Sequence, residues 1–124
     1  MNRIQPSFFY QDLPCSVVSI GCAMEKLQGK FSYDTIKTFS EQASANGNYA
    51  TLQSVGEQVR RFFNVKRYTY YPRAQRRRLG DLCLQKGGIR GIVCVYGHFV
   101  FCDNFDYYSF FNNENDMVVA VWEI

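Results

Sequence analysis

The sequence Gly91-Ile92-Val93-Cys94-Val95-Tyr96-Gly97-His98-Phe99-Val100-Phe101-Cys102 decides the fold class of this chain. It covers most of the apolar run Ile89–Tyr96 and all of the apolar run His98–Cys102, whose length and β-branched and aromatic content are typical of buried strands. A polar turn follows, and after it Tyr107–Phe111 and Met117–Trp122 have the same strand-like composition. The last third of the chain therefore predicts an antiparallel sheet.

Upstream of these strands the apolar residues recur at helical spacing. The expected helices cover residues 15–28, ended by Gly29; 32 or 34 to about 45; 51 to about 63; and 74–86, ended by Gly87-Gly88. Asp12 is a possible N-cap of the first helix and Pro14 fits its first turn, while residues 7–10 predict an extended lead-in and Val65–Tyr71 a strand. Helices followed by antiparallel strands predict an α+β fold, two layers deep, in one domain over residues 1–124.

Composition limits the class of protein. With 124 residues and 47% hydrophobic content the chain is long enough for a core, and no run approaches a membrane span. We expect no membrane association, and because the first residues show no signal peptide, we expect a cytoplasmic protein; delivery outside the cell stays open. The five cysteines are expected to be free thiols, and with one histidine and no CxxC pair we expect no metal and no cofactor.

Positive charge is concentrated in one stretch. Between Glu57 and Asp81 there is no acidic residue, but there are eight of the fourteen basic ones: Arg60, Arg61, Lys66, Arg67, Arg73, Arg76, Arg77 and Arg78. Tyrosines 68, 70 and 71 lie among them. This stretch predicts an acidic or nucleic-acid partner; the alternative is a solvated helix face and a charged edge strand.

The order of Cys15 and His98 along the chain suggests thiol chemistry. A thiol attacks as its thiolate, and an ordinary cysteine has a pKa of about 8.5, so it needs assistance at neutral pH. Cys15 is predicted at a helix start, where the helix dipole stabilises an anion. His98 is the only histidine, so it alone can supply an imidazolium partner.

Such a pair needs two further groups. A residue that orients His98 should stand on the neighbouring strand, and Asn112 or Asn113 is expected there, with Asp103 and Asp106 as alternates. An oxyanion needs donors, which the backbone N–H of Cys15 and the side chain of Gln11 can supply, or Gln5 in place of Gln11.

These residues give the chain a family resemblance. A Gln ahead of a Cys that opens a buried helix, then Tyr96-Gly97-His98-Phe99-Val100, then Phe110-Phe111-Asn112-Asn113, resembles the papain-like cysteine peptidases, and most closely their compact bacteriocin-processing branch. The resemblance implies a papain-like fold with Cys15 as nucleophile, His98 as general base, Asn112 or Asn113 as orienting residue and Gln11 as oxyanion donor. The chain departs from the family pattern in three ways: Ser16 follows Cys15 where the family has Gly, Gln11 lies four and not five or six residues ahead of Cys15, and Asn112-Asn113-Glu114 replaces the Asp-Pro after the second strand.

Three functions remain open at this point. The first is a thiol hydrolase acting on a peptide or amide bond of a peptide or protein substrate. The second is a catalytically inactive papain-like module that binds a peptide or protein. The third is a nucleic-acid-associated protein, for example a small phage or effector protein, which uses Arg60, Arg61, Arg67, Arg76, Arg77 and Arg78.

Overall fold

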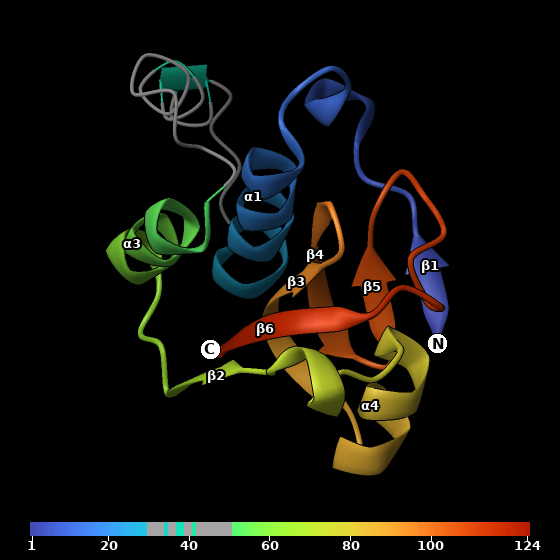
Figure 1. The fold of residues 1–124 in the computed structure, drawn as a ribbon. Helices are drawn as coiled ribbons and strands as arrows, with labels where there is room; N and C mark the ends of the chain where they lie inside the picture. Colours follow the sequence, from blue (N-terminus) through green and yellow to red (C-terminus); the bar gives the residue numbers. More distant parts are fainter. Residues whose placement is uncertain (30–33, 35–36, 39–40, 42–50) are drawn as a thin grey trace.

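A six-stranded sheet forms the centre of the molecule in the computed structural model, which describes residues 1–29, 34, 37–38, 41 and 51–124 (Figure 1). The spatial order of the strands is β1 (Asn2–Ile4), β5 (Asp106–Tyr108), β4 (His98–Asn104), β3 (Ile89–Val95), β6 (Val118–Glu123) and β2 (Arg67–Tyr70). Four of the strand pairs are antiparallel, as predicted. β1 runs parallel to β5, so the sheet is mixed and not purely antiparallel.

The β3–β4 hairpin is the centre of this sheet. Its register runs from Ile89 opposite Asn104 to Val95 opposite His98, so the strand signal of residues 89–102 is confirmed. The chain turns at Tyr96-Gly97, where Gly97 has φ +68°, a conformation that costs an ordinary residue about 1 kcal/mol or more. The turn delivers His98 at the first position of β4.

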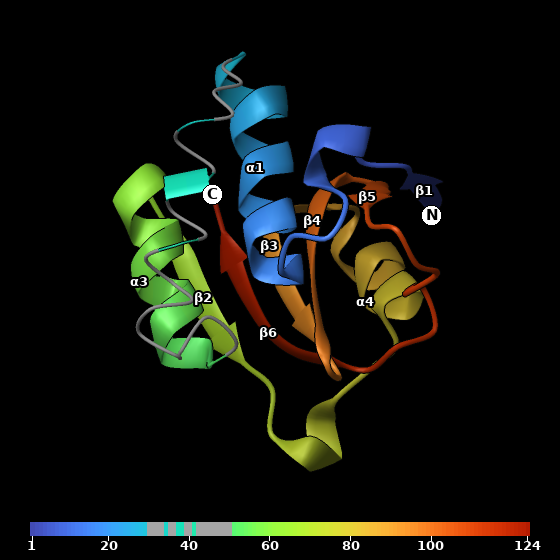
Figure 2. The ribbon, with the colours of Figure 1, turned by 90° about the horizontal axis from the view of Figure 1, so that it is seen from above.

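Helices cover both faces of the sheet. Helices α1 (Cys15–Gln28) and α3 (Leu52–Phe62) share an apolar core with Ile92, Cys94, Phe99 and Trp122, and α4 (Leu79–Lys86) shares a second core with the residues that alternate with these. Figure 2 shows α1 and α4 on opposite sides of the sheet. The α+β class is confirmed, but the molecule has three layers where two were predicted.

Helix boundaries follow local chemistry. The bounds of α1 agree with prediction, and Gly29 ends it in the left-handed conformation at φ +64°. Pro14, and not the predicted Asp12, occupies its N-cap. Asp12 lies two residues before the N-cap, in a left-handed conformation at φ +68°. Thr51 caps α3 by accepting a hydrogen bond from the Ser54 backbone N–H at 3.1 Å.

Other local predictions are wrong. The lead-in at residues 7–10 contains a 3₁₀ turn, Phe8–Tyr10, and is not extended. The helix expected from Ala74 begins at Leu79, because residues 73–75 form a 3₁₀ turn and the Arg77 carbonyl accepts a hydrogen bond from Val118. The helix expected from Ser32 or Asp34 to Ala45 lies outside the described residues, apart from single positions. No described helix is long and apolar enough to cross a membrane.

Candidate thiol site

The Cys15 thiol lies at the N-terminus of α1. It is the first residue of α1 and follows Pro14, whose backbone has φ −56° and ψ 143° at the N-cap. Cys15 is half-buried, while Cys22, Cys83, Cys94 and Cys102 are buried, and all five are free. Because a helix N-terminus carries partial positive charge, Cys15 is the cysteine best placed to act as a thiolate.

Cys15 and His98 line the same small cavity. It has a volume of about 50 Å³ and lies where the start of α1 meets β4 and the segment after β5. The remaining lining residues are mainly apolar: Leu13, Val18, Phe99, Tyr108, Ser109, Phe110 and Phe111. The Phe111 ring lies edge-on to the His98 ring, with centroids 5.5 Å apart. Residues more than eighty positions apart in the sequence are thereby brought to one pocket.

Hydrogen bonds define the protonation pattern of His98. Its Nε2 lies 3.1 Å from Ser109 Oγ, and Ser109 Oγ donates to Asn113 Oδ1 at 2.5 Å. Because Ser109 has only one hydroxyl hydrogen, His98 Nε2 must be the donor in its contact with Ser109. The Asn113 amide is oriented in turn by donating from Nδ2 to Asp116 Oδ2 at 2.8 Å. Neutral His98 therefore carries its proton on Nε2, which leaves Nδ1 as the basic nitrogen.

Burial sets the basicity of this ring. It lowers the pKa of His98 from the ordinary value of 6.5, and the negative charge of Asp116 opposes part of this effect. Neutral imidazole, the form that accepts a proton, is therefore dominant at neutral pH. Ser109 and Asn113, which hold the ring, are themselves buried.

The Cys15 thiol and His98 share a cavity but make no hydrogen bond in the described structure. The reason lies in the register of the hairpin. His98 pairs with Val95, whose side chain packs in the core beneath α4. Because side chains alternate along a strand, Phe99 and not His98 faces α1, the helix that carries Cys15. His98 reaches the cavity only because it stands at the end of its strand.

The other predicted site residues divide into two groups. Asn113 joins the His98 chain, but through Ser109 and not by direct contact. Asn112 and Gln11 are exposed and do not line the cavity. The alternates Asp103 and Asp106 contact Arg90 and Asn2 at the other end of the hairpin. Among the described residues, the cavity thus has no glutamine as an oxyanion donor.

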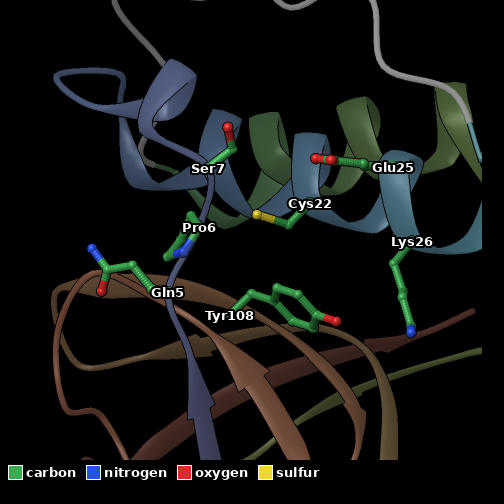
Figure 3. Close-up of a pocket in the computed structure, with 7 residues that line it drawn as sticks. All are labelled: Gln5, Pro6, Ser7, Cys22, Glu25, Lys26 and Tyr108. Atoms are coloured by element: carbon green, nitrogen blue, oxygen red, sulfur yellow. The ribbon is translucent and has the colours of Figure 1, made fainter.

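A second cavity of about 280 Å³ lies further along α1 and shares Tyr108 with the first. Gln5 lines this one, with its side chain held by Arg3, so it too is remote from Cys15. Figure 3 shows the Cys22 thiol pointing from α1 toward the space between Pro6 and Tyr108. Burial, with a smaller contribution from Glu25, raises the pKa of Cys22 to about 12, so this thiol stays protonated and unreactive.

Sequence reasoning missed Ser109 and Asp116, the two residues that complete the His98 chain. A signal for Ser109 was present, because it is the one small hydroxyl residue in the aromatic run Tyr107-Tyr108-Ser109-Phe110-Phe111. A buried hydroxyl in such a run needs hydrogen-bond partners. Asp116 lies in a polar stretch before β6 and carries no comparable signal.

The basic stretch does not form one continuous patch. Arg60 lies over the Tyr68 ring on the side of α3, with 5.8 Å between the guanidinium carbon and the ring centroid. Arg67 follows the opposite face by strand alternation, and Arg77 lines a groove beside α4. Arg61 and Arg78 are exposed, and Arg76 contacts two tyrosines at the sheet edge. The predicted nucleic-acid residues are thus divided between two faces.

No group of three or more His, Cys, Asp or Glu side chains in the described part of the chain could hold a metal ion. No protein-family model matches the chain, and neither does any curated protein or any solved structure. The papain-like resemblance therefore rests on the sequence alone, and the function is argued from the geometry above.

Proposed function

We propose that the protein is a thiol hydrolase that cleaves a peptide or amide bond, with Cys15 as nucleophile and His98 as base. One observation carries the proposal: the only cysteine that is not buried opens a helix and shares a cavity with the only histidine, whose Nε2 is already engaged. The free Nδ1 is the nitrogen that a thiol proton needs.

The reaction follows from these positions. His98 Nδ1 takes the Cys15 proton, and the thiolate attacks the carbonyl carbon to form a C–S bond. Backbone N–H groups of the first turn of α1, with that of Cys15 among them, are donors for the oxyanion. Collapse breaks the C–N bond as His98 returns its proton to the leaving amine, and water, deprotonated by His98, hydrolyses the thioester. The chain of Ser109, Asn113 and Asp116 stabilises the imidazolium formed in between.

This mechanism requires a side-chain movement. The thiol and imidazole share a cavity without a hydrogen bond, so substrate binding has to bring them together. Catalytic hydrogen bonds are often long in free enzymes and shorten in the complex. The volume of about 50 Å³ is small for a substrate side chain, so Phe111, which is exposed, has to move aside when substrate enters.

Acylation by p-nitrophenyl acetate tests the proposal. We expect an acetyl thioester on Cys15, detected by peptide mass spectrometry, followed by turnover. Cys15→Ala and His98→Gln should each lower the rate at pH 7 by about 100-fold or more. Cys22→Ala is the matched control and should react like the wild type, because Cys22 lies outside the first cavity. Equal rates in all three variants would refute the assignment.

A non-catalytic module that binds a peptide or protein is the second candidate. The absence of a hydrogen bond between Cys15 and His98 favours it, as does the exposed position of Gln11. In that case Cys15 should react with iodoacetamide no faster than a free thiol, and the rate should be the same in His98→Gln.

A further inference from the structure

Three side chains at the edge of the sheet form a cluster that thiol chemistry does not use. Arg76 donates from Nη1 to the Tyr96 hydroxyl at 2.7 Å and from Nη2 to the Tyr70 hydroxyl at 3.1 Å. Its guanidinium carbon lies 5.2 Å from the Tyr96 ring centroid and 5.8 Å from that of Tyr70. We call Tyr70, Arg76 and Tyr96 the Arg76 clamp.

The Arg76 clamp is rigid. A third hydrogen bond, from Arg76 Nε to the Tyr71 carbonyl at 2.9 Å, ties the guanidinium to the backbone after β2. Tyr70 comes from β2 and Tyr96 from the β3–β4 turn, so two separate parts of the sheet hold the guanidinium. A preorganised guanidinium loses little conformational entropy when it binds a ligand.

The Arg76 clamp has donors without acceptors. A guanidinium has five N–H donors, and three of them are used, which leaves one on each terminal nitrogen. The hydroxyls of Tyr70 and Tyr96 accept from Arg76 and keep their own O–H, for which the described residues offer no acceptor. No carboxylate of the described chain forms an ion pair with Arg76. The Arg76 clamp thus has up to four unused donors, and a carboxylate is the acceptor that a guanidinium binds best.

Within the described part of the chain, no strand covers the outer edge of β2, the strand beside the Arg76 clamp. β2 is the last strand in the sheet order and pairs only with β6 among the described strands. The Tyr71 N–H donates to the Val119 carbonyl, so alternate residues of the strand face β6. The N–H and C=O groups of Tyr68 and Tyr70 therefore face outward, where an extended peptide can pair with them.

We propose that the Arg76 clamp and the free edge of β2 bind an extended acidic peptide, which adds a strand to β2 and places one Asp or Glu carboxylate on Arg76. Charge supports this occupant, because residues 58–80 contain no acidic side chain and Lys66, Arg67 and Arg73 flank the edge. The site does not depend on Cys15 chemistry.

A peptide fits the site better than a nucleic acid. Bases stack on open aromatic faces, but in the Arg76 clamp the guanidinium already lies over the rings of Tyr70 and Tyr96. The remaining basic side chains are divided between two faces and give no single track for a phosphate backbone. The backbone groups of β2, in contrast, pair only with another polypeptide.

Fluorescence anisotropy at low ionic strength tests this inference. The probes are a labelled peptide of alternating Glu and Thr, the matching Gln and Thr peptide, and labelled oligothymidylate. We expect saturable binding of the Glu peptide, and binding of the Gln peptide weaker by about tenfold. Bound Glu peptide should also slow amide hydrogen exchange at Tyr68 and Tyr70. Tighter binding of oligothymidylate, or no saturable binding of the Glu peptide, would overturn the inference.

Variants locate the site. Arg76→Gln should weaken binding of the Glu peptide by about tenfold, and Arg61→Gln, which removes the same charge from exposed α3 surface, by less than about twofold. Since Arg76 also ties down the backbone, Tyr96→Phe provides a milder variant that keeps the ring but removes the hydroxyl that holds Arg76 Nη1 in place. Its affinity should fall because the guanidinium is less well oriented, while its melting temperature stays close to that of the wild type. Equal losses in Arg76→Gln and Arg61→Gln would show diffuse charge attraction and contradict the proposal.

Discussion

At the scale of single residues, the hydrogen bond between His98 Nε2 and Ser109 determines the tautomer of His98. The Ser109 hydroxyl oxygen accepts hydrogen bonds from His98 Nε2 and from the backbone N–H of Phe111. The same hydroxyl donates a hydrogen bond to Asn113 Oδ1. The Ser109 hydroxyl is used both as donor and as acceptor, which fixes the Nε2 tautomer of His98 without a charged group next to the ring. Asp116 makes no hydrogen bond to His98, and its negative charge raises the pKa of His98 by electrostatic attraction at a distance.

This environment predicts a dependence of stability on pH. Burial lowers the pKa of His98 in the folded state from 6.5, so the unfolded chain takes up the proton first as the pH falls. The free energy of unfolding should decrease as the pH drops through about 6.5, and the loss should be complete below the folded-state pKa. Urea denaturation between about pH 7.5 and about pH 5.5 measures it.

Two variants isolate this effect. His98→Gln removes the only histidine, so the part of the slope due to histidine should disappear. Asp116→Asn keeps an acceptor for the Asn113 amide but removes the charge that raises the pKa of His98, so its slope should be steeper than that of the wild type. An identical slope in the wild type and His98→Gln would show that the ring is not held in a neutral form.

At the scale of elements, β3 is constrained by its neighbour β6. A Cβ placed on Gly91 would lie 2.0 Å from the carbonyl oxygen of Trp122, which is backbone of the paired strand and has no freedom to move aside. Gly91 is therefore required by the close approach of two strands.

Gly91→Ala should consequently lower the free energy of unfolding by about 3 kcal/mol or more. Gly29→Ala is the matched control: its Cβ would meet no atom of the described residues within 4 Å, and the left-handed backbone at φ +64° opposes it. It should cost about 1 kcal/mol. Chemical denaturation of both variants measures the difference, and similar losses would contradict the role of the strand contact.

Sequence reasoning succeeded for elements whose ends carry their own signals. Pro14 and Gly29 bound α1, and Thr51 caps α3, so both helices were predicted nearly to the residue. It failed where a distant segment decides. β1 has only three residues and depends on its pairing with β5. α4 begins later than predicted because the Val118 N–H donates a hydrogen bond to the Arg77 carbonyl. The intrinsic helix and strand propensities of the residues do not predict such tertiary contacts.

The candidate site divides in the same way. The shared cavity of Cys15 and His98 follows from a helix start and a strand start, both visible in the sequence. The partner of His98 depends on how the segment after β5 folds back, which places Ser109 at the ring and Asn113 behind it. A rule that looks for Asn beside His finds the right loop but the wrong contact.

At the scale of the whole molecule, the three layers decide which cysteines react. Burial, with a smaller effect of Cys15, raises the pKa of Cys94 to about 12, and burial also raises the pKa values of Cys83 and Cys102. The reactivity of the five thiols is thus a measure of the packing of both cores.

In the native protein, one thiol should react quickly with Ellman's reagent, namely Cys15, and all five should react in guanidinium chloride. Peptide mass spectrometry after brief alkylation identifies the site. Fast labelling of Cys83 or Cys102 in the native state would mean that the layer beneath α4 opens readily, contrary to its packing.

The parallel pairing of β1 with β5 determines the order in which the sheet can be completed. The Asn2 N–H donates to the Phe105 carbonyl at 3.0 Å, a contact between residues far apart in the sequence. As the chain leaves the ribosome, β1 and the apolar α1 emerge long before the strands that receive them. Residues 2–4 are therefore fixed in place only after β5 has been synthesised, and until β3 and β4 have been synthesised the apolar face of α1 has no strand to pack against.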